Sequence, residues 1–293
     1  MSDRCSIGKL NHRTMRKKST GERLDTRALG PVMLEHLHRY ALVVDIVRNR
    51  TVLDIACGEG YGSALMASTA ASVVGADADA ETVAEAAKNY HHPNLSFRQA
   101  NITALPFDDT AFDAVICFET LEHVEDHEAV LAELKRVLKP DGFLIISTPN
   151  REEYSDKREF SNPFHVKELT VKEFKHLVQQ HFAHSRFWLQ ECLLASFVYN
   201  EDDKRLEESF TGDFTTVSKT TDIKPVYSIA LAANKPLNFG LPAGLFRNDS
   251  LTQRYLQEER DSAKATASYQ LGHFLLWPVK KIFSIFRNKS EQS

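Results

Sequence analysis

The feature that most constrains the fold is the stretch VLDIACGEGYGSALMA at residues 52–67. It begins with an apolar run that one acid, Asp54, interrupts, and it then passes through Gly58, Gly60 and Gly62. The residues that follow are typical of a helix. A buried strand, a glycine turn and a helix in direct succession predict the first unit of an α/β domain with a nucleotide-like ligand at the turn.

The glycines and the helix after them favour a ligand at this turn. Glycine allows positive φ, and it lets the backbone approach a ligand where a Cβ would collide. The helix directs its free N–H groups and the positive end of its dipole into the same space. A glycine turn that holds no ligand is the alternative interpretation.

The spacing of the glycines separates two kinds of ligand. A dinucleotide site requires G-x-G-x-x-G or G-x-G-x-x-A, in which the first two glycines hold a pyrophosphate. Here Gly62 comes one position too early, and Glu59 inside the loop would repel a diphosphate. A cationic cofactor without phosphate fits better, which disfavours NAD-dependent oxidoreduction. The stretch resembles motif I of the class I S-adenosylmethionine-dependent methyltransferases.

The resemblance implies S-adenosyl-L-methionine as the cofactor and a Rossmann-like class I methyltransferase fold of the α/β class. This fold has a seven-stranded, mostly parallel sheet with an antiparallel edge hairpin and helices on both faces. Apolar runs predict further strands at 72–77, 95–100, 113–118 and 143–147, with 182–194 and 226–232 as the edge hairpin. The run ELKRVLKPDGFLIISTPN closely resembles the same element of the ubiquinone-biosynthesis-like branch.

Two polar residues are predicted to recognise the nucleoside of the cofactor. Asp77 ends the second predicted strand, where an acid can accept hydrogen bonds from both ribose hydroxyls. A role for Asp77 in capping the next helix is compatible with this assignment. Asn101 stands where the family commonly has an acid that binds the adenine amino group, and its amide oxygen can still accept a hydrogen bond. The resemblance assigns to the cofactor Asp54, Ala56, Gly58, Gly60, Tyr61, Asp77, Ala78, Asn101, Ile102 and Phe118.

The predicted chemical site follows the fourth strand, in the run FETLEH at 118–123. Strand ends at the carboxyl edge of such a sheet face the ligand crevice. If a helix has begun by Glu119, then Glu119 and His123 share one face at i and i+4. His123, with an ordinary pKa of about 6.5, could take a proton from an attacking hydroxyl. The alternative is a histidine that only shapes the cofactor pocket.

Two further segments carry candidate contacts to the acceptor. In the resembled enzymes the acceptor enters over the loop after the fifth strand, so Asn150 and Asn162 are candidate contacts and His165 is a second candidate base. An amphipathic helix at 31–48 is of the kind that often covers the cofactor, and Arg39 and Tyr40 on it could line the pocket. An exposed helix face would look the same. The scattered His and Asp residues form no compact ligand set, so no metal is expected.

Composition and charge set the wider limits. The chain has 293 residues, of which 42% are hydrophobic and 26% charged, as is ordinary for a soluble globular protein. The net charge of -4 gives no case for nucleic acid as a partner. Four cysteines lie far apart, and no signal peptide or uncharged apolar run of about 18 residues is visible. These features predict free thiols in the cytoplasm.

The sequence divides into three predicted parts, and the oligomeric state is open. Residues 1–20 are a basic arm expected to be disordered, residues 21–235 the methyltransferase domain, and residues 236–293 a C-terminal extension. Aromatic and basic residues alternate over 268–289, which predicts an interfacial helix on the inner face of the plasma membrane. A tail docked on the domain or on a partner subunit is the alternative.

The acceptor is predicted from resemblance alone. The string TGER…LEHLHRY…VLDIACGEGYGS, with NPFHVKEL downstream, resembles methyltransferases of bacterial surface-polysaccharide synthesis. This implies an oxygen of a sugar or of a glycan-terminal phosphate as the methyl acceptor. A small molecule such as a quinone precursor is the alternative substrate. A protein that binds the cofactor without turnover is the alternative function.

Overall fold

The computed structural model describes residues 30–159, 161–193, 209–212, 215–221, 224–247 and 249–266. They belong to two compact units, a larger one over residues 31–246 and a smaller one that contains helix α6 (Asp249–Ala265). The basic arm at 1–20 and the segment at 268–289 lie outside the described residues, so their predicted roles stay predictions. Within the described part, no helix combines the length and apolarity needed to cross a bilayer.

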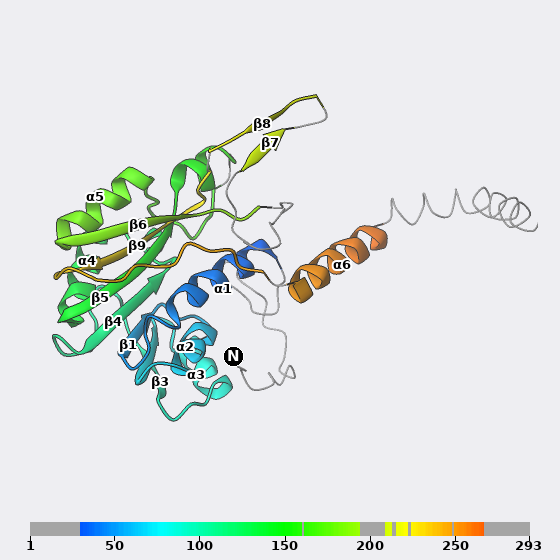
Figure 1. Cartoon of the computed structure of the whole chain (residues 1–293). Helices are drawn as coiled ribbons and strands as arrows, with labels where there is room; N and C mark the ends of the chain where they lie inside the picture. Colours follow the sequence, from blue (N-terminus) through cyan, green and yellow to red (C-terminus); the bar gives the residue numbers. More distant parts are fainter. Residues whose placement is uncertain are drawn as a thin grey trace, which may run out of the picture. The chain divides into compact units, whose positions relative to one another are not determined.

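The larger unit is built on a seven-stranded sheet with the order β3-β2-β1-β4-β5-β9-β6 (Figure 1). The strands are β1 (Thr51–Ile55), β2 (Ser72–Asp77), β3 (Leu95–Gln99), β4 (Phe112–Phe118), β5 (Leu138–Pro149), β6 (His184–Gln190) and β9 (Tyr227–Ala233). The first five strands pair in parallel, whereas β9 runs antiparallel to both β5 and β6. The predicted mostly parallel sheet with an antiparallel edge pair is confirmed.

Helices cover both faces of this sheet, and this explains why its central strands are nearly continuous apolar runs. The helices of the larger unit are α1 (Pro31–Val43), α2 (Tyr61–Ala67), α3 (Ala80–Asn89), α4 (His127–Val137) and α5 (Val171–His181). One buried cluster contains Leu134 of α4 and Phe174 of α5. A second contains Val43 of α1 and Met66 of α2. The two clusters therefore lie on opposite faces of the sheet.

Side chains cap the N-terminal ends of two helices. Asp79 caps α3 by accepting a hydrogen bond from the backbone N–H of Glu81. Thr170 and Glu173 form a reciprocal capping box at the start of α5. These caps satisfy backbone donors that the first turn of a helix leaves unpaired. Both helices therefore begin directly after a capping side chain.

Three segments have further local structure. Pro140 and Gly142 lie inside β5, which begins directly after α4 ends at Val137, and its pairing with β4 is irregular between Phe112 and Ala114. The charged segment at 151–161 contains a π-helical turn, η2 (Glu152–Asp156). The described part of the polar excursion at 201–221 contains a two-stranded ribbon of β7 (Phe210–Gly212) and β8 (Val217–Lys219).

The segment after β9 stays in contact with the sheet. Leu241 is buried, and Leu237 and Phe239 pack against the core. The ring of Phe239 meets the ring of Phe143 edge-on, with 5.1 Å between the centroids. Contact with the sheet thus continues beyond residue 235, although the division of the chain into arm, domain and extension stays a prediction.

Candidate active site

The turn after β1 is shaped by left-handed backbone. Ala56, Gly58 and Gly60 have φ values of 59°, 53° and 84°. A Cβ added to Gly60 would lie 2.7 Å from the ring of Phe97, whereas one added to Gly58 would meet nothing within 4 Å. Gly60 precedes α2, and no side chain of the described residues caps that helix. The loop therefore leaves open space at Gly58, beside a helix N-terminus that favours an anionic group.

Asp77 ends β2 beside this loop and is 5% exposed. Its Oδ2 accepts a hydrogen bond from the backbone N–H of Gly58 at 3.0 Å, and its Oδ1 accepts one from that of Asp79 at 3.0 Å. Asp77 therefore ties the glycine loop to the end of β2.

Asp54 and Tyr40 lie beneath the loop. Asp54 is fully buried and accepts hydrogen bonds from Ser63 Oγ at 2.6 Å and from the hydroxyl of Tyr40 at 3.3 Å. The ring of Tyr40 packs so closely on Gly62 that an added Cβ there would lie 2.0 Å from it. Tyr40 is 5% exposed and its hydroxyl is engaged by Asp54, so its position does not support the predicted substrate contact. It supports the glycine loop from below.

Burial makes Asp54 a pH-sensitive element of the fold. Removal from water raises its pKa from 3.8 to about 7, so the folded state binds the proton more tightly than the unfolded state does. This contribution to stability is complete below pH 4 and is lost as the pH rises towards 7, by at most about 1.4 kcal/mol per pH unit. Between pH 5 and 7, the free energy of unfolding of the wild type should fall by about 2 kcal/mol more than that of Asp54→Asn. Urea unfolding at the two pH values measures this difference. An equal decrease in both proteins would contradict this assignment.

The other predicted cofactor contacts differ in burial and in hydrogen bonding. Ile102 and Phe118 are buried apolar side chains, Ala78 is exposed, and the hydroxyl of Tyr61 lies 3.1 Å from Nδ1 of His36. Asn101 Oδ1 accepts hydrogen bonds from both the backbone N–H and the hydroxyl of Thr103, each at 3.0 Å. Both of its lone pairs are engaged in this arrangement, which departs from the predicted acceptor role towards the adenine amine.

The run after β4 corrects the predicted shared face of Glu119 and His123. Glu119 has a φ of 50° and is not helical, and the helical turn η1 covers only Leu121–His123. Oε1 of Glu119 accepts a hydrogen bond from Ser147 Oγ at 2.6 Å and lies 3.8 Å from Nη1 of Arg39. Glu119 is thereby held between β5 and α1 and is not paired with His123.

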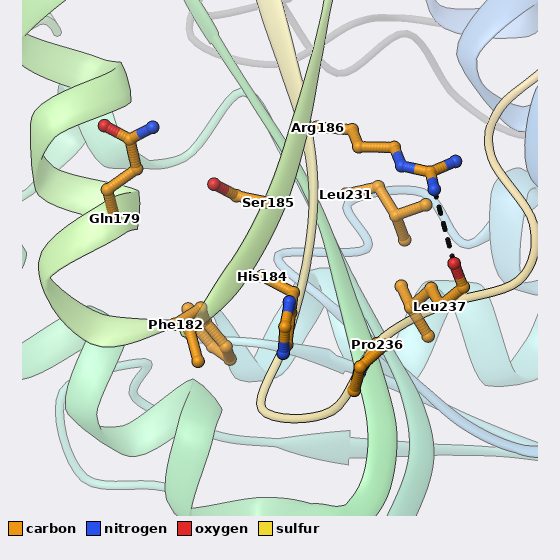
Figure 2. Close-up of a pocket in the computed structure, with 9 residues that line it drawn as sticks. Gln179, Phe182, His184, Ser185, Arg186, Leu231, Pro236 and Leu237 are labelled. Carbon is orange, nitrogen blue, oxygen red and sulfur yellow. Dashed lines mark hydrogen bonds between the residues drawn. The ribbon is translucent and has the colours of Figure 1, made fainter.

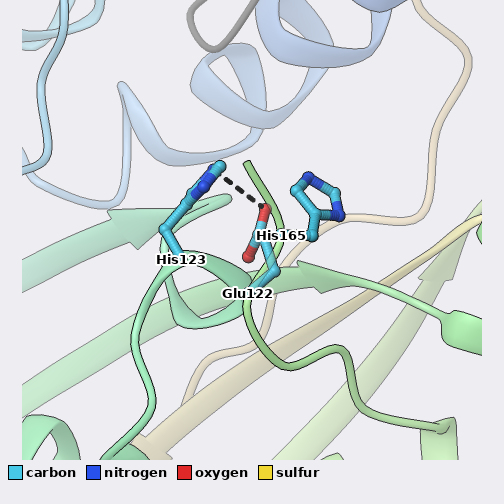
Figure 3. Close-up of side chains that lie close together, drawn as sticks. All are labelled: Glu122, His123 and His165. Atoms are coloured by element: carbon cyan, nitrogen blue, oxygen red, sulfur yellow. Dashed lines mark ion pairs between the residues drawn. The ribbon is translucent and has the colours of Figure 1, made fainter. Parts of the chain in front are cut away.

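His123 instead meets Glu122 and His165 (Figure 3). Nε2 of His123 lies 4.0 Å from Oε1 of Glu122, and the two histidine rings meet edge-on at 5.1 Å. One potential ligand atom from each of the three residues lies within 4.8 Å of the others. The expectation that the chain has no compact set of metal-ligand side chains is therefore wrong, because folding brings together residues that are distant in the sequence.

The surroundings of this cluster hold it in place. Nδ1 of His123 lies 2.9 Å from the carbonyl oxygen of Phe164, and Nδ1 of His165 contacts Oε1 of Glu168. The backbone N–H of Val166 donates to the carbonyl oxygen of Glu122 at 2.7 Å. These bonds fasten the loop that carries His165 to η1. Glu122 and Glu168 were not among the predicted site residues, and only the adjacency of Glu122 to His123 in FETLEH could have indicated the former.

The remaining candidate contacts differ in their freedom to bind a ligand. Arg39 is fully buried, and its Nη1 donates to Oε1 of Gln190 at 2.6 Å, whereas Nε and Nη2 find no partner among the described residues. Asn150 is also buried, and its Nδ2 donates to the carbonyl oxygen of Pro225. Asn162 Oδ1 accepts from the backbone N–H of Phe164 at 3.1 Å. Arg39 thus has unused donors and Asn150 has an unused acceptor in Oδ1, whereas Asn162 makes a local backbone bond.

A cavity of about 520 Å³ lies away from these residues, between the end of α5, the start of β6 and residues 236–237 (Figure 2). Arg186 crosses it to donate to the carbonyl oxygens of Leu237 and Phe239 at 3.4 and 3.3 Å. Because β6 starts beside the end of β9, this is the amino edge of the parallel strands. No predicted site residue lines the cavity, so the chemistry is assigned to the opposite edge.

The strand order, the glycine loop after β1 and the acid after β2 define the class I methyltransferase fold, and solved structures agree. A Haloferax volcanii protein assigned as a methyltransferase, solved with the Trm112 activator, gives a TM-score of 0.51 at 20% identity over 70% of this chain and 93% of that chain. A Bacillus halodurans protein assigned as a methyltransferase gives 0.50 at 15% identity over 69% and 100%. The predicted fold class is confirmed.

Sequence comparisons match the central region of the chain to known methyltransferases. Residues 53–146 match the family described as "Methyltransferase domain". The chain is 40% identical over 131 residues to a probable S-adenosylmethionine-dependent methyltransferase of Mycolicibacterium smegmatis, covering 44% of this chain and 50% of that protein. It is 36% identical over 130 residues to a ubiquinone biosynthesis O-methyltransferase of Actinobacillus pleuropneumoniae, covering 42% and 54%. The chain spans about half the length of these curated relatives. In this central region, the predicted resemblance to the S-adenosylmethionine-dependent methyltransferases is confirmed.

Proposed function

We propose that the protein is an S-adenosylmethionine-dependent methyltransferase that methylates an oxygen of a sugar or of a glycan-terminal phosphate in cell-surface polysaccharide synthesis. The observation that carries this proposal is the gathering of three features at one edge of the sheet. The glycine loop follows β1, Asp77 ends β2, and the Glu122, His123 and His165 cluster lies just after β4. The proposed cofactor site at the glycine loop and Asp77 therefore lies next to the Glu122, His123 and His165 cluster, along neighbouring strand ends.

The residues at the glycine loop fit the donor. Asp77, at the end of β2 beside the loop, is the proposed acceptor for the ribose hydroxyls, and the N-terminus of α2 favours the carboxylate of the methionine part. The loop at Gly58 leaves the space that a Cβ would fill. When bound, the cofactor supplies a methyl group on a positively charged sulfur. The chain's task is to orient the acceptor oxygen towards that methyl group and to assist the loss of its proton.

The cluster after β4 is the proposed place of the acceptor oxygen. His123 is partly exposed, and Glu122 lies behind it in the interior. Tyr154 stacks on the ring of His165 with 5.2 Å between centroids, which helps to hold that ring in the cluster. Glu119, which pairs with Arg39, lies beside this cluster. These residues would bind the hydroxyl group, and Asn162 on the same loop stays a candidate contact.

Arg39 supports an anionic acceptor. A buried guanidinium with two nitrogen atoms that lack hydrogen-bond partners is costly unless a ligand completes it. A phosphate group matches its donor geometry well. The alternative substrate, a quinone precursor, is favoured by the likeness to ubiquinone biosynthesis O-methyltransferases. Contact of residues 268–289 with the membrane surface belongs to the proposal on sequence grounds, because it would suit a lipid-linked glycan.

The proposal is tested by incubating the protein with methyl-labelled S-adenosylmethionine and a cell-envelope glycan extract. We expect label to appear on a glycan oxygen, located by mass spectrometry, and the demethylated cofactor to accumulate. Label on a quinone precursor offered in parallel, with none on glycan, would support the alternative substrate. Binding of the cofactor with no transfer to either would indicate a binding protein without turnover.

A further inference from the structure

We propose that Glu122, His123 and His165 bind one divalent transition-metal ion, which holds and activates the acceptor hydroxyl. This inference rests on the proposed methyltransferase function and assigns a chemical role to the cluster after β4. None of the features that identify the fold requires a metal, so the inference depends on the geometry and hydrogen bonding of these three side chains.

The ligand atoms converge from two parts of the chain. Glu122 and His123 come from η1, and His165 comes from the loop before α5, so that the carboxylate lies between the two rings (Figure 3). The three ligand atoms lie within 4.8 Å of one another. Ligands at about 2.0–2.2 Å from one ion lie roughly 3–3.5 Å apart. A rotation of these side chains that closes the cluster by about 1 Å would therefore complete the site.

Hydrogen bonds leave Nε2 of each histidine as the free ligand atom. The carbonyl oxygen of Phe164 can only accept, so Nδ1 of His123 carries the proton at that 2.9 Å contact. Nδ1 of His165 likewise donates to the carboxylate of Glu168, which also accepts from the hydroxyl of Ser155 at 2.9 Å. A neutral imidazole then has its lone pair on Nε2. Histidines that bind metals almost always donate the other ring N–H to such an oxygen.

The charge of Glu122 also calls for a cation. Its side chain is almost fully buried, and its Oε2 accepts one hydrogen bond, from the hydroxyl of Thr148 at 3.2 Å. Within the described part of the chain, its ion pair is with His123, at 4.0 Å. A bound cation would offset the cost of an ionised carboxylate in this position.

The ligand set indicates the kind of ion. Two imidazole nitrogens and one carboxylate suit Mn²⁺, Fe²⁺, Co²⁺ or Zn²⁺, whereas Mg²⁺ and Ca²⁺ prefer oxygen ligands throughout. Three protein ligands leave coordination positions open, which is typical of catalytic sites and not of structural ones. One open position would take the acceptor oxygen.

The metal defines where each proton and electron pair goes. A metal-bound hydroxyl has a lowered pKa, so its proton leaves to water. The oxygen uses an electron pair to form the bond to the methyl carbon, the carbon–sulfur bond breaks, and its electron pair stays on sulfur. No oxidation or reduction takes place. His123 and His165 then act as ligands, and neither is the base that the sequence suggests.

The test is titration of Mn²⁺ and of Zn²⁺ into the full chain after chelator treatment, followed by calorimetry and, for Mn²⁺, by electron paramagnetic resonance. We expect one site per chain that prefers these ions to Ca²⁺. Glu122→Gln and His165→Ala should each weaken binding by at least about 10-fold, and Glu168→Ala, which removes only the support of His165, by about 10-fold. The matched control is His181→Ala, because His181 pairs with Glu128 on the surface and its loss should leave metal affinity unchanged.

Binding of the demethylated cofactor is measured in every variant to establish that each is folded. Absence of stoichiometric metal binding in a folded wild type that binds the cofactor would overturn the inference. Equal metal affinity in the wild type, Glu122→Gln and His165→Ala would also overturn it, as would full turnover by metal-free protein. Metal binding that follows the expected pattern, without transfer to any acceptor, would support the metal site and count against the proposed function.

Discussion

Replacement of Asp77 by alanine is expected to weaken binding of S-adenosylhomocysteine, the demethylated cofactor, by a factor of about 10²–10⁴. The reason is the loss of two hydrogen bonds from ribose hydroxyls to a charged acceptor, each worth roughly 1.5–3 kcal/mol. Asp77 lies at the end of β2 with both oxygen atoms directed at the glycine loop and the start of α3. Isothermal titration calorimetry on wild type and variant measures the effect.

A matched control separates the ribose contact from support of the loop. Asp79→Ala removes the neighbouring cap of α3, which should lower stability by about 1 kcal/mol and leave cofactor affinity near the wild-type value. An analogue without the ribose hydroxyls should bind the wild type weakly, and Asp77→Ala should not weaken it further. An affinity of Asp77→Ala for the cofactor within twofold of the wild type would refute the ribose assignment.

Replacement of His123 by alanine is expected to lower kcat by at least about 100-fold while the affinity for the cofactor stays within twofold. His123 lies in the cluster with Glu122 and His165, where the acceptor oxygen is proposed to bind. The glycine loop and Asp77 belong to other strand ends, so the donor pocket should remain intact. Single-turnover kinetics with labelled cofactor and calorimetry on the same preparation measure the two quantities separately.

The control for this variant is His91→Ala, since His91 is exposed on the loop between α3 and β3 and lies outside the site. It should change neither kcat nor cofactor affinity. A His123→Ala protein that keeps its turnover would show that His123 neither binds nor activates the acceptor. A variant that loses the cofactor as well would place His123 in the donor pocket, against the proposal.

Features that depend on neighbouring residues could be predicted from the sequence. The strand before Gly58, the glycine turn and the helix after it are encoded within one short stretch, and the structure has them in that order. Asp77 follows directly from an apolar strand, so its place at the carboxyl edge of the sheet needs no long-range information. The antiparallel pairing of β6 with β9 follows from two alternating runs in a chain of this fold.

Features that depend on contacts between distant segments could not be predicted from the sequence. Glu119 has a left-handed φ, which is incompatible with the expected helix. The hydroxyl of Ser147 donates a hydrogen bond to the carboxylate of Glu119 and holds the residue in that conformation. Tyr40 looks like a pocket residue on an amphipathic helix, but the missing side chain at Gly62 admits its ring into the core. The pairing of His123 with His165 depends on how the loop before α5 folds back onto η1. No local pattern records these contacts.

Calorimetry with three ligands on the full-length wild type tests the central claim most directly. The crevice beside Gly58 and Asp77 should bind one equivalent of S-adenosylmethionine and one of S-adenosylhomocysteine per chain, in competition with each other, and should show no heat with NAD. Absence of heat with both sulfur ligands, together with tight binding of NAD, would contradict the assignment of this site.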